Sequence, residues 1–394
     1  MDKKYLMDTL RRYYPDIKPL RKQISAFRVR RTSGMLLDNE QVVRGEQDEK
    51  FKSQLVKDAL SQKKSMVRST FRMMKDIISR CPDYKDRTDL GKLKTDIIFC
   101  RLAYGFQPDE YLCFDLENKS MEERRQFISD IEHYLYLYRM NDLSETQIFN
   151  NKGMTYKHFG KYYHREVLYL SSKKDLSEFR AFVSRHSQFV RKAVYEGMGR
   201  SVALVDMNDN TSSVEEIFED MISHGPHVVE ERVIQNEALS ALNPSSVNTI
   251  RCITLNTRNG VVVAYCFMKI GQGGSFIDNG GAGGILVGID HTTGILDTDG
   301  YDELNKRYET HPDTGIRFAG YQLPEFQKML DICCEMSALT PRVKCIGWDM
   351  AYTDNGWVVI EGNGMTQMIG PQIVWKRGIK SEMLDLMKDM DLIV

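Results

Sequence analysis

The segment over residues 346–363 constrains this chain most, because it places acidic side chains inside a predicted β-hairpin. An apolar run leads to Asp354-Asn355-Gly356, and a second apolar run follows over residues 357–360. Asp-Asn-Gly between apolar runs predicts a hairpin turn, because the turn needs residues that tolerate positive φ. The segment is therefore expected to form two antiparallel strands.

Antiparallel pairing would bring acidic side chains together near the open end of this hairpin. Asp349 and Glu361 would lie side by side, and Asn363 would follow Glu361 on the same face. Two carboxylates and an amide oxygen suit a hard divalent cation such as Mg²⁺, with Mn²⁺ as a second candidate. The alternative is a surface hairpin with solvated acids. The neighbouring Trp, Ile, Val and Met residues predict burial, and buried unpaired carboxylates are costly, so the pattern favours a metal site.

The charge of the chain is unevenly distributed. With 394 residues, 42% hydrophobic and 28% charged, the chain is predicted to be a soluble globular protein of two or three domains. Residues 1–80 carry 20 Lys and Arg against 10 Asp and Glu, a net charge of +10, so the remainder carries −11 within the total of −1. Such a basic segment suits nucleic acid, a membrane surface or a polyanionic substrate, and it equally suits the acidic remainder of the chain.

Cysteine spacing and hydropathy indicate the compartment. The eight cysteines form no C-x-x-C pair, and the N-terminus does not resemble a signal peptide. The most apolar run, residues 261–268, is too short to cross a bilayer. We therefore expect a cytoplasmic protein with reduced thiols and no transmembrane segment.

Residues 1–140 have helical periodicity. The clearest helix is predicted over residues 123–139, with an apolar stripe formed by Phe127, Ile131, Tyr134, Leu135 and Tyr138. No zinc-finger or helix-turn-helix spacing is found, so no nucleic-acid partner is expected. The region is predicted to be a helical, basic accessory domain whose partner the sequence does not reveal.

A candidate phosphate-binding segment follows. A helix over 153–159, which Lys152 precedes, and strands over 165–170, 187–192 and 202–206 are predicted. Lys192 ends the second strand, and the next loop contains Gly197 and Gly199. A lysine charge and a flexible loop with free backbone N–H groups suit a triphosphate. A plain hairpin turn is the alternative, since the glycines match neither the P-loop nor the dinucleotide-binding spacing.

The next segments indicate further strands and an unusual loop. Residues 228–234 are predicted to form a strand with acids at its centre, and strands over 252–257 and 261–269 follow. The loop over residues 271–284, called the glycine-rich loop below, has glycine at seven of its 14 positions and contains Asp278 and Asn279. Such a loop is either mobile or allows the backbone to approach a ligand closely. Frequent hairpin turns and an amphipathic helix over 324–339 favour antiparallel sheets with packed helices, an α+β fold.

Together these segments resemble the ATP-grasp superfamily. Asp349 with Glu361-Gly-Asn363 is similar to the metal-binding hairpin of that fold, and the upstream segments follow in the order that the fold uses. More narrowly, the chain resembles the sugar-transfer associated ATP-grasp subfamily at residues 243–251, 277–284, 289–294, 311–315 and 346–349.

The resemblance covers about residues 145–375 and implies two α+β subdomains that grip ATP, after a helical domain over 1–140. Within a catalytic region over 141–394, we expect a nucleotide-gripping subdomain with a lid over about 150–235. A metal-binding and acceptor subdomain would follow over about 236–394.

The resemblance also implies roles for individual residues. The nucleotide side would consist of Lys152 and Lys192 on the phosphates, Gly197 and Gly199 in the lid, Glu230, Glu231 and Val233 in the adenine-contacting strand, and Glu237 on the ribose. The metal side would consist of Asp349, Glu361 and Asn363 around Mg²⁺. Relatives often place an Arg two residues before the metal-binding Asp, where this chain has Gly347. Arg251 or Lys269 would have to supply that charge.

The implied activity is ATP-dependent carboxylate–amine ligation through an acyl phosphate, with release of ADP and phosphate. Arg251 would clamp the acyl carboxylate or the γ-phosphate, because its planar fork suits either. Asp278 and Asn279 would orient the acceptor, with Asp278 as base for the amine. A structural salt bridge is the alternative for Arg251, and an Asx-type turn is the alternative for Asp278.

Substrates and alternatives stay open at the level of sequence. The expected partners are a small carboxylate and a small amine, and the subfamily name associates them with sugar conjugates and polysaccharide biosynthesis. One alternative is a kinase that acts on a hydroxyl or phosphate acceptor. Another is a nucleotide-binding interaction protein with little turnover. Nothing in the sequence indicates an oligomeric state.

Overall fold

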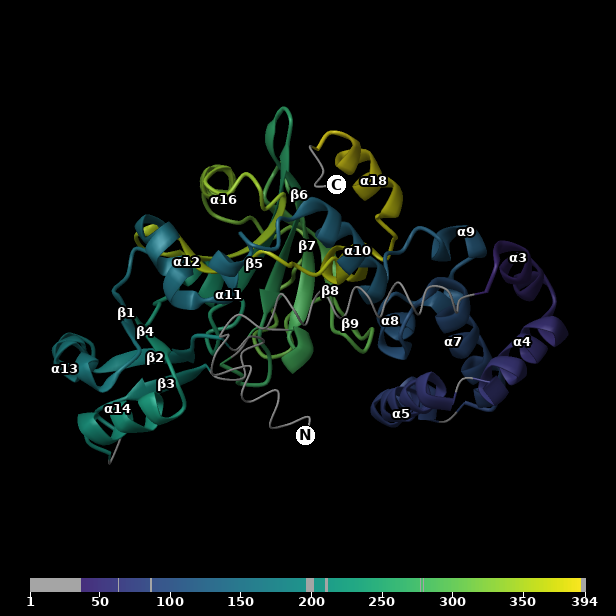
Figure 1. The fold of residues 1–394 in the computed structure, drawn as a ribbon, viewed down its shortest axis with the longest axis horizontal. Coiled ribbons are helices and arrows are strands. Elements are labelled where there is room, and N and C mark those ends of the chain that lie inside the picture. The colour runs from purple at the N-terminus through teal and green to yellow at the C-terminus, as the bar shows by residue number, and fades with distance from the viewer. Residues whose placement is uncertain are drawn as a thin grey trace.

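The computed structural model describes residues 37–390, except residues 63, 86, 196–201, 210–211, 277 and 279. The described chain forms helices first and two antiparallel sheets with packed helices afterwards (Figure 1). This arrangement confirms the predicted α+β class with a helical N-terminal region. No helix within the described ranges has both the length and the apolar character that a bilayer span requires.

The N-terminal region is helical, but its predicted last helix is divided. The helices are α3 (Asn39–Gln47), α4 (Glu49–Gln62), α5 (Lys64–Arg80), α6 (Pro82–Lys85), α7 (Leu90–Tyr104), α8 (Pro108–Cys113), η1 (Leu116–Asn118), α9 (Met121–Arg124) and α10 (Asp130–Met140). The continuous helix predicted over 123–139 is wrong, because the Ser129 hydroxyl caps a new helix by accepting the Glu132 N–H at 3.2 Å.

The predicted apolar stripe of that helix is wrong as well, except at one position. Phe127 is buried, but it lies between α9 and α10. The buried residues of α10 are His133, Tyr136, Leu137 and Met140. The stripe was predicted for one helix over 123–139, but α10 starts only at Asp130. Tertiary packing decides which of its faces is buried, and the sequence periodicity does not reveal this.

The small sheet has the strand order β1-β4-β2-β3, and all its pairs are antiparallel. Its elements are β1 (Val167–Leu170), η3 (Lys173–Asp175), α13 (Leu176–Arg185), β2 (Gln188–Ala193), β3 (Ala203–Asp206), α14 (Val214–Ser223) and β4 (His227–Glu231). Helices α13 and α14 cover one face with a core that includes Phe179, Phe189 and Phe218 (Figure 1). The strand predicted over 228–234 is too long, because the chain leaves the sheet after Glu231 to reach the large sheet.

The large sheet has the order β11-β10-β5-β6-β7-β8-β9 and is also antiparallel. Its strands are β5 (Thr249–Thr257), β6 (Gly260–Ile270), β7 (Ile285–Asp290), β8 (Ile295–Tyr301), β9 (Arg307–Tyr308), β10 (Cys345–Thr353) and β11 (Gly356–Asn363). The remaining helices are α11 (Gln147–Asn150), α12 (Lys152–Phe159), η2 (Gly160–Tyr162), α15 (Glu237–Ser240), η4 (Gly280–Ala282), α16 (Phe326–Ala338), α17 (Ile369–Trp375) and α18 (Lys380–Lys388).

The opening hairpin forms as predicted. Strands β10 and β11 pair around the turn at Asp354 and Asn355, and Gly356 has the positive φ of 96° that the turn requires. In this register Asp349 lies directly opposite Glu361, which confirms their predicted pairing. The hairpin is an edge of the large sheet, with β10 next to β5.

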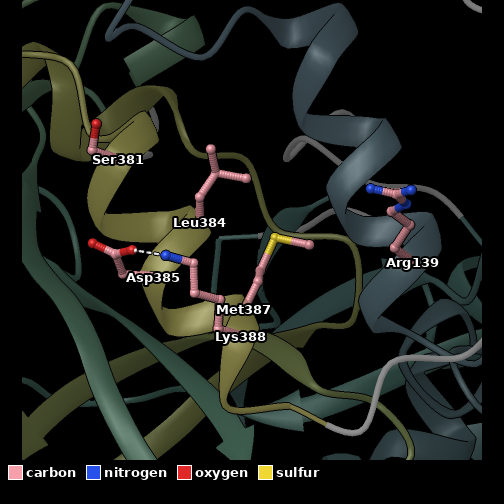
Figure 2. Close-up of a pocket in the computed structure, with 6 residues that line it drawn as sticks. All are labelled: Arg139, Ser381, Leu384, Asp385, Met387 and Lys388. Atoms are coloured by element: carbon pink, nitrogen blue, oxygen red, sulfur yellow. Dashed lines mark hydrogen bonds and ion pairs between the residues drawn. The ribbon is translucent and has the colours of Figure 1, made fainter.

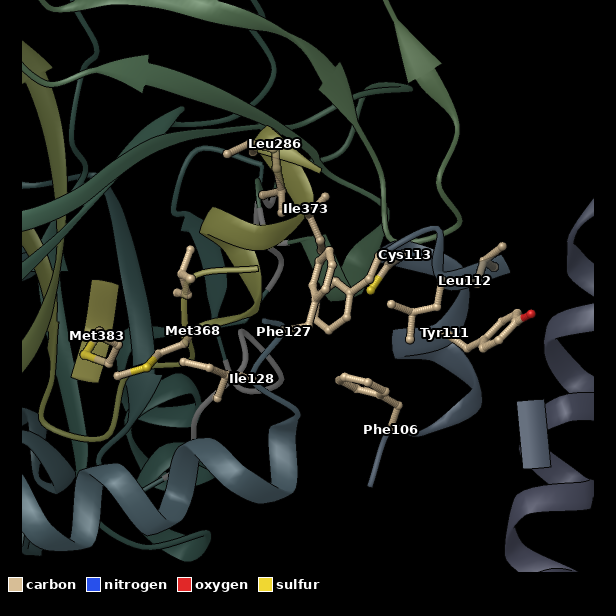
Figure 3. Packing of buried hydrophobic residues seen from close by; sticks show 14 of the residues in the cluster. Phe106, Tyr111, Leu112, Cys113, Phe127, Ile128, Leu286, Met368, Ile373 and Met383 are labelled. Atoms are coloured by element: carbon tan, nitrogen blue, oxygen red, sulfur yellow. The ribbon is translucent and has the colours of Figure 1, made fainter. Parts of the chain in front are cut away.

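The two faces of the large sheet are covered by different helices. One face, which includes Ile253 of β5 and Phe267 of β6, packs against the N-terminal helices and α17. Figure 3 shows this core, with Phe127 of the helical region beside Ile373 of α17. The other face, which includes Trp348 of β10, packs against α12 and α16. The helical region therefore shares a hydrophobic core with the sheet that carries the predicted metal site.

Candidate functional site

The centre of the candidate site is Asp349, whose side chain is 4% exposed between two cations. Arg251, directly opposite on β5, donates from Nε and Nη2 to the two carboxylate oxygens at 2.6 and 2.9 Å. Lys269 of β6 places its Nζ 3.2 Å from Oδ2. Burial alone would raise the pKa of Asp349, but Arg251 and Lys269 outweigh it and lower the pKa to about 2. The alternative of a solvated surface acid therefore does not hold for Asp349.

Gly347, two residues before Asp349, has no room for a side chain. A Cβ atom at residue 347 would lie 2.2 Å from Thr366 Oγ1 and 3.1 Å from Arg251 Cδ. No side chain fits there unless its neighbours move. The space next to Asp349 is filled from the adjacent strand by Arg251, whose Nη1 also donates to Thr366 Oγ1 at 3.2 Å. Arg251 and Lys269, the two residues predicted to supply the missing positive charge, thus both contact Asp349.

Glu361 and Asn363 lie on the other side of Asp349, along β11. Glu361 is opposite Asp349, and Asn363 is opposite Gly347, so both lie on the same face of the sheet as Arg251. Both side chains are half-buried. Among the described residues, the Glu361 carboxylate forms no hydrogen bond or ion pair with another group. Its oxygens are therefore free to accept a ligand.

The donor set around Asp349 fits a hard divalent cation. Asp349, Glu361 and Asn363 offer only oxygen ligands from two paired strands, which Mg²⁺ prefers. Carboxylate oxygens carry about four lone-pair sites in total, so Asp349 retains capacity beyond its three contacts with Arg251 and Lys269. Among the described residues, no three His, Cys, Asp or Glu side chains gather closely enough to hold a metal ion, at Asp349 or elsewhere, so a cation here would also need the amide oxygen of Asn363.

Asp278 joins the cluster from the glycine-rich loop. Its Oδ2 accepts the backbone N–H of Thr249 at 3.0 Å and the Thr249 hydroxyl at 2.5 Å. Its Oδ1 is 4.0 Å from Lys269 Nζ. Burial raises the pKa of Asp278 above its ordinary value, against the opposing effects of Lys269 and Thr249, and the nearby Asp349 adds to the rise. Asn279, predicted beside it, lies outside the described residues.

Glu230 forms a second charged group in the small sheet. Its side chain is 5% exposed, and Oε1 lies 2.9 Å from Lys192 Nζ. Arg165 donates from Nε and Nη2 to Oε2 at 3.0 and 2.7 Å, and from Nη1 to the carbonyl of Val359 at 2.7 Å. Burial alone would raise the pKa of Glu230, but Lys192 and Arg165 lower it to about 2. Arg165 thereby connects the small sheet to β11 of the large sheet.

Lys152 and the predicted lid are placed less completely. Lys152 begins α12, where Asn151 caps the helix, and its Nζ donates to the carbonyl of Ala193 at 3.3 Å. It therefore lies at the end of the strand that carries Lys192. Gly197 and Gly199 lie outside the described residues.

The segment between the two sheets contains the other predicted nucleotide residues. Glu231 ends β4, and its carboxylate accepts the backbone N–H of Glu166 at 3.1 Å, so one of its oxygens already has a partner. Val233 is half-buried in the connecting segment, and the next residue, Ile234, is 65% exposed. Glu237 is exposed at the first position of α15.

Sequence reasoning missed Arg165, Thr249 and Thr366. Arg165 was assigned only to a strand, and its partner Glu230 is 65 residues away in the chain. No local pattern distinguishes such an arginine from a surface residue. Thr249 follows Asn248 at the start of β5, where a hydroxyl before an apolar run is the only signal.

A groove elsewhere in the molecule contains none of these residues. It has a volume of about 580 Å³ and lies between α10 and α18 (Figure 2). It is lined by Arg139, Ser381, Leu384, Asp385, Met387 and Lys388. The N–H of Arg258, after β5, donates to the carbonyl of Asp389, after α18, at 2.8 Å. The groove therefore lies near the C-terminal end of β5, whereas Arg251 lies near its N-terminal end. The groove and Arg251 are roughly 20 Å apart.

The sequence matches the family described as sugar-transfer associated ATP-grasp over residues 132–388, and the chain belongs to this family. The match extends over both sheets and begins within α10. The resemblance inferred from the motifs is thereby confirmed, together with the ATP-grasp fold. No curated protein matches the sequence significantly.

The solved structures that match this chain do so at low sequence identity. The D-alanine–D-alanine ligase from Coxiella burnetii has 13% identity and a TM-score of 0.40, covering 63% of this chain and 59% of that one. The corresponding enzyme from Bacillus anthracis has 17% identity and a TM-score of 0.38, covering 64% and 70%. N5-carboxyaminoimidazole synthetase from Staphylococcus aureus, solved with ADP, has 9% identity and a TM-score of 0.39, covering 61% and 53%. The chain thus spans less than two thirds of the first of these proteins.

Proposed function

We propose that this protein is an ATP-dependent carboxylate–amine ligase. The observation that carries the proposal is the buried Asp349, held between Arg251 and Lys269 with Glu361 opposite, in a chain of the ATP-grasp family. Phosphoryl transfer needs positioning and charge neutralisation more than a covalent nucleophile, and this group supplies fixed charges of both signs.

The proposed reaction has two steps. A substrate carboxylate oxygen attacks the γ-phosphorus of ATP, and the bond to the leaving ADP breaks, which gives an acyl phosphate. The amine nitrogen then attacks the acyl carbon and loses a proton, and the bond to phosphate breaks, which gives an amide. Asp278 is the candidate acceptor of that proton, because its carboxylate lies near Lys269 and Asp349 and burial raises its pKa above the ordinary value, which makes it a stronger base.

The residues divide into a nucleotide side and a metal side. Lys152 and Lys192 would neutralise phosphate oxygens, while Arg251 would orient the γ-phosphate or the acyl carboxylate from its position beside Asp349. Mg²⁺ would be held by Asp349, Glu361 and Asn363, and when bound it would neutralise phosphate charge. Mn²⁺ has the same ligand preference and is the expected substitute.

On the nucleotide side, Glu230, Glu231, Val233 and Glu237 would line the adenine and ribose site. The chain between β4 and α15 carries the exposed Ile234, which offers apolar surface to a nucleobase. Gly197 and Gly199 would belong to the phosphate lid, and Asn279 to the acceptor side. The substrates would be small and sugar-linked, in a cytoplasmic pathway of polysaccharide or sugar-conjugate synthesis.

ADP release in the presence of Mg²⁺ tests the proposal. Amino acids, uronic acids and amino sugars would be supplied in pairs, and hydroxylamine would then replace the amine. A ligase is expected to release ADP with one carboxylate and to form its hydroxamate. A phosphorylated product that survives hydroxylamine would instead identify a kinase.

Variants complete this test. Asp349→Asn is expected to abolish ADP release, while Asp385→Asn in the distant groove leaves it unchanged. Full activity of Asp349→Asn would overturn the metal assignment. Binding of Mg²⁺·ADP without turnover in every pair would identify a nucleotide-binding interaction protein.

A further inference from the structure

The loop over residues 309–316 has no role in the proposed reaction, yet it contacts the glycine-rich loop through a buried histidine. His311 has an exposed fraction of 0%, and its Nε2 lies 2.8 Å from the carbonyl of Gly271. Its Nδ1 accepts the backbone N–H of Asp313 at 3.2 Å. Because Nδ1 accepts a hydrogen bond, the ring is neutral and carries its proton on Nε2, which donates to Gly271. Both ring nitrogens are therefore used to hold backbone.

Asp313 makes the second contact between the two loops. Its Oδ2 accepts the backbone N–H of Gly273 at 2.6 Å. A carboxylate that accepts a backbone N–H forms a charge-assisted bond, which is stronger than a neutral one. His311 and Asp313 thus hold alternate residues at the start of the glycine-rich loop.

The start of the glycine-rich loop is also held from its opposite side. The N–H of Gly271 donates to Ser246 Oγ at 3.3 Å, and a Cβ atom at Gly271 would lie 2.6 Å from that oxygen. Ser246 Oγ in turn donates to Asn248 Oδ1 at 2.8 Å, and Asn248 Nδ2 donates to Gln235 Oε1 at 3.1 Å. Gln235 lies in the segment that connects the two sheets, so the polar network extends from the nucleotide side to the glycine-rich loop.

Two further contacts hold described residues of the glycine-rich loop. Gln272 Nε2 donates to the carbonyl of Gly283 at 2.5 Å, which links the two ends of the loop. Asp278, between these ends, is held by Thr249 beside Lys269. The position of Asp278 therefore depends on an anchor at Thr249 and on the held start of the loop.

We propose that His311 and Asp313 are positioning residues for the amine acceptor. They hold residues 271–273 so that the glycine-rich loop presents Asp278 beside Lys269, where the amine loses its proton. The inference rests on the proposed ligase function. Neither residue touches the reacting atoms, so both act through the loop.

Matched variants separate the two hydrogen bonds. His311→Gln retains a donor near the Nε2 position and therefore the bond to Gly271, whereas His311→Asn retains only an acceptor near Nδ1. Asp313→Asn keeps a neutral acceptor for Gly273, and Asp313→Ala removes it. Asp313 is exposed, so its variants are expected to fold. Glu309→Gln, in an exposed ion pair with Arg307, is the control in the same segment.

Hydrogen–deuterium exchange tests the anchoring without any substrate. Exchange of the amides over residues 271–276 is expected to rise about 5- to 30-fold in His311→Asn and Asp313→Ala, because each variant loses a hydrogen bond that opposes opening of the loop. His311→Gln, Asp313→Asn and Glu309→Gln should change it much less. Unchanged exchange in both His311→Asn and Asp313→Ala would overturn the proposal.

Steady-state kinetics tests the role in positioning. With the carboxylate identified by ADP release, hydroxylamine serves as the amine probe. Asp313→Ala is expected to raise the KM for hydroxylamine about 10-fold, while the Kd of Mg²⁺·ADP and the KM for ATP stay within about 2-fold. A faster-exchanging loop with an unchanged KM for hydroxylamine would overturn the positioning role. If the protein releases ADP with none of the carboxylates, the ligase proposal fails. The hydrogen–deuterium exchange result would still show whether His311 and Asp313 anchor the loop.

Discussion

The two sheets share one electrostatic feature: each contains a buried carboxylate between an arginine and a lysine. In the small sheet, Glu230 lies between Arg165 and Lys192. Burying a carboxylate is costly unless it is paired and hydrogen-bonded, and here both oxygens have a cationic partner. Arg165 also bonds the carbonyl of Val359, so this group holds two sheets together.

In the large sheet, Asp349 also lies between an arginine and a lysine, although Arg251 donates to both of its carboxylate oxygens and Lys269 shares one of them. The difference lies in what surrounds the group. Glu361 is directly opposite Asp349, and Asp278 is near Lys269. Among the described residues, these two additional acids have no counterpart in the contacts of Glu230.

This difference determines which ligand each group would attract. Glu230 with its two cations has a formal charge of +1, which suits a phosphate oxygen. The three acids and two cations around Asp349 have a formal charge of −1 when all are ionised, which suits a divalent cation. Two similar ion-pair groups thus acquire opposite preferences, because β11 and the glycine-rich loop contribute acids to only one of them.

The largest expected effect is on stability when Glu230 is removed. Glu230→Ala leaves Arg165 and Lys192 buried without a carboxylate, so we expect a loss of about 3–5 kcal/mol in the free energy of unfolding. Asp349→Ala should cost less, because Glu361 and Asp278 remain near Arg251 and Lys269. Denaturant unfolding of the two variants measures the contrast. An equal or larger loss in Asp349→Ala would break the comparison.

The next effect is on binding and turnover. Lys192→Met is expected to weaken Mg²⁺·ADP binding about 10-fold, because it removes a charge from the nucleotide side. Lys269→Met should leave that affinity within about 2-fold but lower the rate of ADP formation about 100-fold, since in the proposed reaction its charge would act beside the reacting groups. Calorimetry gives the affinities and an ADP-coupled assay gives the rates. Equal weakening of ADP binding in both variants would mean that the two groups are not specialised.

The acid dependence of stability should also differ between the groups. Both carboxylates have a pKa lowered to about 2 in the fold, from 4.5 for Glu230 and 3.8 for Asp349. A lowered folded pKa gives stability that is present above the unfolded pKa and lost as the pH falls toward the folded one. The contributions are about 3 kcal/mol for Glu230 and about 2 kcal/mol for Asp349.

Glu230 should therefore dominate the loss of stability between pH 5 and 3. Denaturant unfolding at several pH values, compared between the unchanged protein and Glu230→Gln, measures this contribution. The unchanged protein is expected to lose about 2 kcal/mol more than Glu230→Gln by pH 3. Parallel pH profiles would contradict the assignment of the lowered pKa to the Arg165 and Lys192 contacts.

The asymmetry between the groups also explains what the sequence could predict. The Asp349–Glu361 pair lies in one local hairpin, but its two-residue turn alone would place Asp349 opposite Ile360. A register shift between Asp349 and Met350 brings Glu361 opposite Asp349 instead. Arg251 and Lys269 were identified as candidates because Gly347 leaves a charge missing. Arg165 was missed, because its partner lies 65 residues away and only the strand order β1-β4-β2 brings them together.

The division of the helix predicted over 123–139 has a similar physical origin. Its residues favour a helix throughout, but Phe127 is buried in the core shared with the large sheet, and Ser129 caps the next helix. Tertiary packing overrides local propensity there. The strand predicted over 228–234 failed for the same reason, since the chain must cross between the sheets after Glu231.

The smallest effect is expected at a buried lysine that lacks a carboxylate. Lys376 donates from Nζ to the carbonyl of Cys113 at 3.1 Å and to Asn305 Oδ1, and it lies 4.0 Å from the ring centre of Tyr301. Burial lowers its pKa from 10.5 to about 8, because the described groups that contact it are neutral and the nearby Asp115 and Asp302 oppose the effect of burial only in part. Its charge therefore opposes folding, whereas those of Lys192 and Lys269 offset a buried acid.

Lys376→Met sharpens this contrast. At pH 7 the variant should change the free energy of unfolding by less than about 1 kcal/mol, because the lost hydrogen bonds are offset by the removal of a desolvated charge. Between pH 8 and 10.5 the unfolded chain binds a proton that the folded chain does not, so this group makes the unchanged protein more stable as the pH rises. The variant should lack that rise in denaturant unfolding at pH 7 and pH 10. A loss of unfolding free energy at pH 7 as large as that in Glu230→Ala would show that a buried lysine stabilises this fold without a carboxylate. The groups around Glu230 and Asp349 would then differ only in the ligands that they attract.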